Sequence, residues 1–197
     1  MGQPRPLDGL TVFEFGHSVA APYAGLILSD LGARVIKVEN PEGGDYARGW
    51  GPPFWRDSSS VFHSLNRGKE SVSVNFSDPV ELSALRSRIL AEADVVIQNL
   101  RPGVLARHGL DPGQLRAEKP ELIWCDITAF GSSGPLASHP GYDPLVQALS
   151  GLMSVTGEGG GRPPVRVGVS IMDMGAAMWA VIGLLSALIT RRSRGEG

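Results

Sequence analysis

Short apolar runs alternate with longer stretches of helical spacing along the chain. Strands are expected at the apolar runs 10–15, 34–39, 71–76, 95–98 and 122–126. Helices are expected at 22–31, 78–92, a short stretch from 111, 143–153, and from Ser170 or Asp173 onward. Strands separated by helices need crossover connections, which favour a mostly parallel sheet. The pattern predicts an α/β fold: a Rossmann-like, doubly wound sheet with helices on both faces.

Three Asp-Pro pairs, at 78–79, 111–112 and 143–144, mark helix starts. Asp is a favoured N-cap, and Pro is tolerated in the first helical turn. Residues 40–60, with Gly43-Gly44 and Pro52-Pro53, are expected to form a long irregular loop. Loops of that length are usually functional or mobile. A second flexible loop is expected at 157–164.

The last apolar stretch, 174–190, carries no charge over 17 residues. That length is at the short edge of what can span a bilayer. The stretch contains two glycines and four alanines and begins directly after Asp173. We interpret it as a helix buried on most sides in the protein core, and we expect no membrane partner.

Composition excludes several functional classes. Lys and Arg number 18 and Asp and Glu 20, so the net charge is −2, which gives no support for nucleic-acid binding. Hydrophobic residues make up 42% and charged residues 19%, as in globular proteins. The single cysteine, Cys125, excludes an internal disulfide framework, and the four histidines lie far apart, so no metal site is expected. The absence of an apolar N-terminal stretch favours a cytoplasmic location.

The segment 16–20 (GHSVA) follows the first predicted strand and partly matches two motifs. A dinucleotide-binding turn needs further glycines that are missing here, so an NAD-binding module is disfavoured. Glu39 is therefore expected to be a solvated side chain at a strand end rather than a ribose ligand. Ser18 could occupy a nucleophile elbow, but no downstream histidine has a distinctive setting. A serine hydrolase is disfavoured as well.

Asp173 is the most informative single residue. Burial of a carboxylate between apolar residues at the start of an apolar helix costs free energy. Such a residue is therefore expected either to have a function or to cap the helix. Two interpretations stay open: an N-cap of that helix, or a carboxylate nucleophile or base kept partly dry beside a Gly-rich loop. Arg67 and Lys69 are likewise either phosphate contacts or a charged turn before a strand.

Taken together, these stretches resemble class III CoA-transferases of the CaiB/BaiF type. The resemblance covers nearly the whole chain, and it rests on the order and spacing of several segments. These are 7–10 (LDGL), 21–24 (APYA), 30–39 (DLGARVIKVE), 65–69 (LNRGK), 99–103 (NLRPG), 141–143 (GYD), 150–153 (SGLM) and the helix that carries Asp173.

The resemblance implies a reaction in which a carboxylate attacks an acyl-CoA thioester and CoA finally moves to an acceptor carboxylic acid. Asp173 stands at the position of the family's catalytic Asp. Acyl-CoA is then a substrate, and no permanently bound cofactor is expected. The implied CoA-binding residues are Ser18, Val19, Ala20, Asn66, Arg67, Lys69, Asn99, Leu100, Arg101 and Arg107, with Tyr142 and Asp143 beside the thioester.

Two departures from the family pattern bear on function. Asn40 stands where some relatives carry Arg, which removes one possible phosphate partner. The family also includes α-methylacyl-CoA racemases, which use a His in a Gly-His-Asp stretch. Here that stretch contains Tyr142, and a phenol with a pKa near 10 is a poor base at neutral pH. Transfer is therefore preferred over racemisation.

Length is the third departure, because family members are roughly twice as long. The resemblance implies that residues 1–190 form the CoA-binding, N-terminal part of the family's large domain, and that 191–197 begin the interdomain linker. The resemblance further implies that the family's small domain lies outside this sequence and that the full-length proteins form an interlocked homodimer. A half that binds CoA without catalysis is the alternative function, and apolar surface is expected where the rest would pack.

Overall fold

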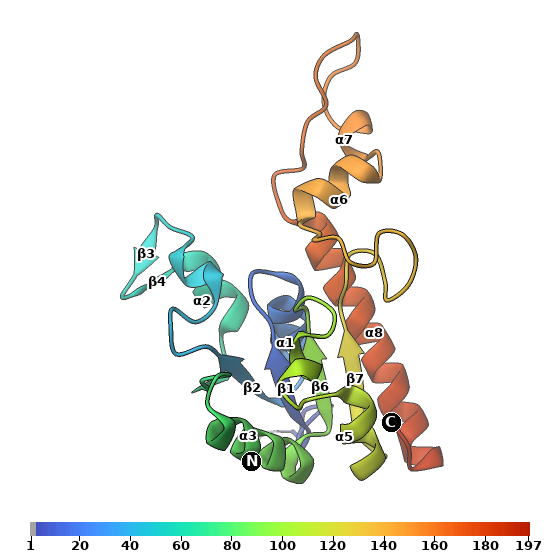
Figure 1. Cartoon of the computed structure of the whole chain (residues 1–197). Coiled ribbons are helices and arrows are strands. Elements are labelled where there is room, and N and C mark those ends of the chain that lie inside the picture. Colours follow the sequence, from blue (N-terminus) through green and yellow to red (C-terminus); the bar gives the residue numbers. More distant parts are fainter. Residues whose placement is uncertain (1–2) are drawn as a thin grey trace.

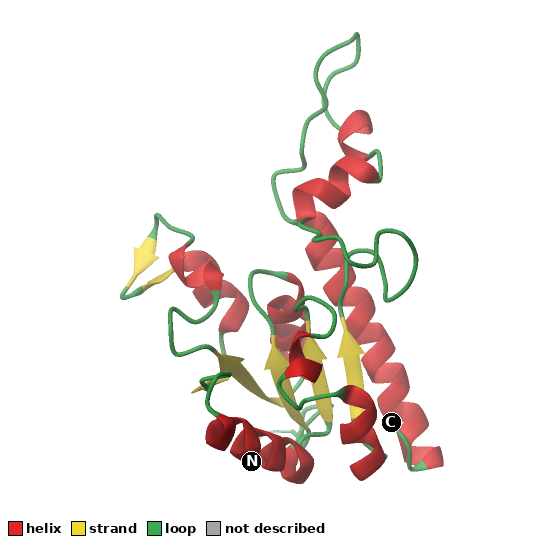
Figure 2. Cartoon of the chain, viewed as in Figure 1, coloured by secondary structure: helices red, strands yellow, loops and turns green. Residues whose placement is uncertain are grey.

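A five-stranded parallel sheet forms the centre of the computed structural model, which describes residues 3–197 (Figures 1 and 2). Its strand order is β5-β2-β1-β6-β7, and every neighbouring pair is parallel. The strands are β1 Thr11–Phe15, β2 Arg34–Glu39, β5 Glu70–Ser73, β6 Val95–Gln98 and β7 Ile123–Asp126. The order reverses between β1 and β6, which is the topology of a doubly wound sheet. The predicted α/β fold is confirmed.

Helices cover both faces of this sheet (Figure 1). One face packs on α1, Ala20–Asp30, and α8, Ile171–Arg194, through residues such as Val12, Val95 and Leu184. The other face packs on α3, Pro79–Glu92, α4, Val104–Arg107, and α5, Pro112–Glu118. Successive side chains of a strand point to opposite faces, so Val12 and Phe13 enter different cores.

Two of the three Asp-Pro pairs cap helices as predicted. Asp78 accepts a hydrogen bond from the Val80 amide at 2.8 Å, and Asp111 accepts one from the Gln114 amide at 3.0 Å. The third pair begins α6, Asp143–Leu149, but the N-cap position belongs to Tyr142. The carboxylate of Asp143 is directed to a different helix, which is described with the site below.

Residues 40–60 are more ordered than the sequence suggested. They contain a 3-10 helix, η1 Tyr46–Gly49, and a short antiparallel hairpin of β3 Phe54–Trp55 and β4 Ser58–Ser59. The helix α2, Ser60–Asn66, then begins at a Ser59 cap, whose hydroxyl accepts from the Phe62 amide at 3.0 Å. The prediction of an irregular loop was wrong because these short elements are fixed by side-chain caps, which hydrophobic periodicity does not report.

Three predicted boundaries also differ from the structure. The third strand covers 70–73 rather than 71–76. The helix expected at 143–153 is split by Gly151, whose φ of 79° lies in the left-handed region, into α6 and α7, Leu152–Val155. Residues 191–194, expected to begin a linker, continue α8, and Arg191 pairs with Asp94 at 3.0 Å.

The helix α8 buries one face only. Its buried side chains are Ala177, Val181, Leu184 and Leu188. Trp179 and Ile189 on the outer face are 74% and 70% exposed. The expectation of burial on most sides was wrong, because α8 packs on α1 and β7 and no described element covers its outer face. By length and composition α8 could cross a membrane, but the core helix of a globular protein meets the same criterion.

The one-sided packing of α8 predicts unequal costs of truncation. Leu184→Ala leaves a cavity against α1 and the sheet and should lower the free energy of unfolding by about 2–5 kcal/mol. Ile189→Ala removes an exposed side chain and should change it by no more than about 0.5 kcal/mol. Urea denaturation of the two variants measures both values. Equal losses would contradict the packing described here.

Candidate active site

A cavity of about 450 Å³ lies beyond the carboxyl ends of β1, β6 and β7. This is the edge at which doubly wound sheets bind ligands. Its walls come from the turns that follow these strands, from η1, and from the first turn of α8. The lining residues that matter most below are His17, Tyr46, Asn99, Arg101, Tyr142 and Asp173.

Asp173 lies in the first turn of α8, partly buried, and lines this cavity. The N-cap of α8 is Ser170, so the interpretation of Asp173 as the N-cap was wrong. The free amides of this helix end are taken by Asp143 instead: its Oδ2 accepts from the amides of Met172 at 2.7 Å and Asp173 at 3.3 Å. The start of α6 is thereby tied to the start of α8.

A second contact holds Asp143 in place. The side-chain NH2 of Gln147, one turn along α6, donates to Asp143 Oδ1, and the side-chain oxygen Oε1 of Gln147 accepts from the Val167 amide at 2.9 Å. Both side chains are buried. Asp143 was expected to flank the thioester. The structure places it behind the cavity wall, where it orients the turn that carries Asp173.

The surroundings of Asp173 raise its pKa to about 6. Burial is the larger cause, because it disfavours the charged form, and the negative charge of Asp143 adds to it. At pH 7 the carboxylate is still mostly ionised, yet it is more basic than an exposed aspartate. A partly desolvated carboxylate with a raised pKa is suited to act as a nucleophile.

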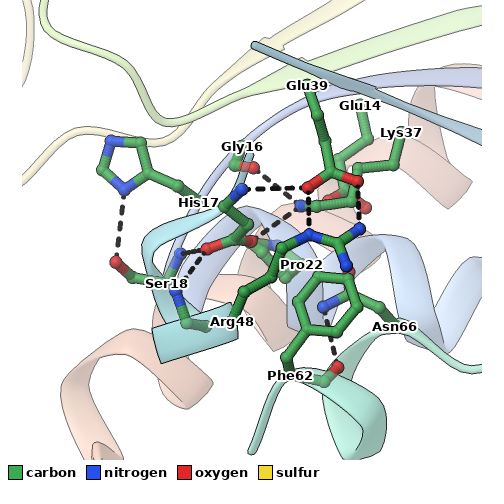
Figure 3. A network of polar contacts seen from close by, with 12 residues as sticks. Glu14, Gly16, His17, Ser18, Pro22, Lys37, Glu39, Arg48, Phe62 and Asn66 are labelled. Atoms are coloured by element: carbon green, nitrogen blue, oxygen red, sulfur yellow. Dashed lines mark hydrogen bonds and ion pairs between the residues drawn. The ribbon is translucent and has the colours of Figure 1, made fainter. Parts of the chain in front are cut away.

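Buried ion pairs join side chains of β1, β2 and the segments that follow β2 (Figure 3). The ammonium of Lys37 lies 2.8 Å from Glu14 Oε1 and 2.9 Å from Asp45 Oδ2. Lys69 lies 2.7 Å from Glu14 Oε2 and donates to the Pro22 carbonyl at 2.7 Å. Burial lowers the pKa of Lys69 to about 8 although Glu14 opposes this. Burial acts on Lys37 in the same direction, but Glu14 and Asp45 outweigh it and raise its pKa.

Glu39 joins the same region and is buried, so the expectation of a solvated side chain was wrong. It accepts hydrogen bonds from Arg48 at 2.7 and 2.9 Å, from the Ser71 hydroxyl at 2.6 Å and from the Asp45 amide at 2.9 Å. Burial alone would raise the pKa of Glu39, but these hydrogen bonds lower it to about 2. Its role here is to hold η1 against β2.

The predicted site residues fall into three groups. Six line the cavity: Ala20, Asn99, Leu100, Arg101, Tyr142 and Asp173. Three are buried beside it: Ser18, Val19 and Asp143. The remaining four lie outside the cavity wall: Asn66, Arg67, Lys69 and Arg107.

The four outlying residues have other partners or positions. Lys69 is engaged by Glu14, and it also donates to Asn66 Oδ1 at 2.8 Å. Arg67 pairs with Asp30 at 2.5 Å on the surface. Arg107 is exposed at the end of α4. Their contact with CoA stays a prediction.

Sequence reasoning missed His17 and Tyr46 as site residues. Their rings pack together with centroids 4.7 Å apart, and both line the cavity. Burial lowers the pKa of His17, although the charge of Asp45 opposes this, so the imidazole is neutral at pH 7. The available signal was position: His17 directly follows β1, and Tyr46 lies in the long connection after β2. Among residues 3–197, no three His, Cys, Asp or Glu side chains gather as metal ligands.

Residues 7–197 match the sequence profile of CoA-transferase family III. The chain is 46% identical over 98% of its length to a succinate–glutarate CoA-transferase of Agrobacterium fabrum and 42% identical over 98% to an acetyl-CoA:oxalate CoA-transferase of Acetobacter aceti. It superposes on a CaiB/BaiF family protein from Brucella suis with a TM-score of 0.93 and 46% identity, over 99% of the chain and 52% of that protein. The chain therefore belongs to CoA-transferase family III. It spans about half the length of these relatives, 49% of each of the two enzymes.

The raised pKa of Asp173 predicts a pH effect on stability. Between about pH 4 and pH 6 the Asp173 carboxyl is protonated in the folded protein but ionised in the unfolded chain. Its contribution to the free energy of unfolding therefore falls as the pH rises. Asp173→Asn cannot ionise and should therefore gain stability relative to the wild type across that interval. Urea unfolding of both proteins from pH 4 to pH 7 measures the difference. A constant difference would show that the folded pKa of Asp173 is not raised.

Proposed function

We propose that the protein transfers CoA from an acyl-CoA to a carboxylic acid through an acyl anhydride on Asp173. The observation that carries this proposal is the position of Asp173. It is a partly buried carboxylate of raised pKa on the wall of a cavity at the ligand-binding edge of the sheet. Membership of CoA-transferase family III supports the same chemistry.

In the first step a carboxylate oxygen of Asp173 attacks the thioester carbonyl. A C–O bond forms, the C–S bond breaks, and CoA leaves as a thiolate. The thiolate then attacks the Asp173 carbonyl and releases the first acid, which leaves an aspartyl-CoA thioester. The acceptor carboxylate attacks that thioester, and the returning thiolate takes the acceptor acyl group from the new anhydride. The carboxylate is restored without net loss of the thioester bond.

Small dicarboxylic acids are the substrate class that we propose. The names of the relatives refer to succinate, glutarate and oxalate, all of which carry a second carboxylate. Within the cavity wall, Arg101 offers a guanidinium and His17 a neutral imidazole that could bind the carboxylate that does not react. We further propose that the protein acts as a cytoplasmic homodimer and takes acyl-CoA as a substrate rather than as a resident cofactor.

Hydroxylamine trapping tests the nucleophile directly. The protein is mixed with succinyl-CoA and hydroxylamine and digested, and the peptide that carries Asp173 is examined by mass spectrometry. We expect a hydroxamate on Asp173 in the wild type and none in Asp173→Asn, with steady-state transfer reduced at least about 10³-fold. Asp111→Asn, which changes only the exposed cap of α5, serves as the control and should retain the hydroxamate.

Two results would contradict the proposal. A bound acyl-CoA that never labels Asp173 would mean binding without catalysis by this carboxylate. Exchange of the substrate α-proton with solvent deuterium, without transfer of CoA, would indicate the isomerase chemistry of the family instead.

A further inference from the structure

Three side chains bind the backbone of the turn between β1 and α1, and Figure 3 shows the contact of Lys37 with Gly16. Lys37 donates to the Gly16 carbonyl at 2.7 Å. Asn99 accepts from the His17 amide at 3.1 Å and donates to the His17 carbonyl at 3.0 Å. Asp45 accepts from the Ser18 amide at 2.8 Å. Four consecutive backbone polar atoms therefore depend on side chains from distant parts of the chain.

This turn is strained at Ser18. Its φ is 68°, in the left-handed region that residues with a Cβ avoid. Such a conformation persists only where the surroundings impose it. The Ser18 amide is bound by Asp45 inside the protein, so the contact that fixes this φ is shielded from competing water.

Asp45 is itself rigidly held, and it does not line the cavity. Its Oδ1 also accepts from the Ala47 amide at 2.9 Å, and its Oδ2 pairs with Lys37 at 2.9 Å. Its own amide donates to Glu39 at 2.9 Å. The carboxylate therefore connects η1, which follows β2, to the turn that follows β1.

The residue that this turn presents to the cavity is His17. Its Nδ1 lies 3.2 Å from the Ser18 hydroxyl, and its ring packs on Tyr46. The same cavity holds Asp173. A change in the Ser18 backbone would therefore move the imidazole relative to the carboxylate.

We infer that Asp45 is a positioning residue, which holds the strained 16–18 turn and thereby fixes His17 on the cavity wall shared with Asp173. The inference rests on the proposed function only where it predicts a change in the rate of CoA transfer. The placement of the imidazole is a property of the folded protein and can be measured separately.

The experiment compares four changes in the full protein. Asp45→Ala removes the acceptor of the Ser18 amide, and Asp45→Asn retains an acceptor oxygen. Ser18→Gly, alone and combined with Asp45→Ala, removes the cost of positive φ. Ser18→Val disfavours the left-handed conformation without changing any charge near Lys37, so it tests the turn even if Asp45→Ala does not fold.

Two readouts are used: the ring signals of His17 in proton–carbon NMR spectra, and kcat/KM for CoA transfer from succinyl-CoA. With four histidines in the chain, the His17 signals can be assigned by substitution. The control is Arg56→Gly in the Asp45→Ala background. Arg56 is the other described non-glycine residue with positive φ, at 52°, and it lies in the β3–β4 hairpin away from the cavity.

We expect Asp45→Ala and Ser18→Val to shift or broaden the His17 signals and to lower kcat/KM about tenfold, the effect expected from the cost of one left-handed residue. Asp45→Asn and the Ser18→Gly combination should recover most of both losses. Arg56→Gly should recover neither, because it relieves strain elsewhere.

Two results would overturn the inference. If the His17 signals in Asp45→Ala and Ser18→Val match the wild type, the 16–18 turn keeps its conformation without the contact from Asp45. If Asp45→Asn is as impaired as Asp45→Ala and Ser18→Gly gives no recovery, Asp45 acts by balancing buried charge. Loss of transfer in every protein, with the His17 signals behaving as expected, would contradict the proposed reaction and leave the inference standing.

Discussion

The buried ion pairs of Lys37 with Glu14 and Asp45 are the constraint on which the site depends. Taking a charge out of water costs several kcal/mol, and only close partners offset that cost. Here the partners belong to β1, β2 and the segment after β2, so the charges can be satisfied only when these elements meet. Even α1 is adapted to them: a Cβ at Gly25 would lie 2.0 Å from Glu14 Oε2. The network therefore fixes where β1 ends and where His17 stands.

A second buried carboxylate, Asp143, has the equivalent role for the turn that carries Asp173. It accepts hydrogen bonds from the amides of Met172 and Asp173, and its charge adds to the burial that raises the pKa of Asp173. The site therefore consists of one cavity lined by two turns, the 16–18 turn and the start of α8, each of which is held by a buried carboxylate. One presents a neutral imidazole and the other a carboxylate of raised basicity. Both anchors lie outside the cavity lining, so His17 and Asp173 are held in place by side chains that do not line the cavity.

Local signals were sufficient for much of the fold. Four of the five sheet strands follow from apolar runs, whereas the bounds of β5 and the β3–β4 hairpin do not. Asp78 and Asp111 cap the next turn of their own helices, so sequence alone predicts these caps. Asp143 has the same Asp-Pro signature, but its partner amide at Met172 lies 29 residues away and is set by the tertiary structure. Glu39 is polar in sequence and buried in the fold because Arg48 neutralises it. Apolar composition likewise indicated a helix at α8, although it cannot say which of its faces is covered.

If Asp173 is the nucleophile, its carboxylate receives the acyl group inside this cavity. A crystal structure of the protein, frozen shortly after a soak with succinyl-CoA, tests it most directly. We expect continuous electron density between a carboxylate oxygen of Asp173 and the acyl carbon, with the CoA sulfur beside the same cavity. CoA bound elsewhere on the molecule, or an acyl group joined to a different side chain, would contradict it.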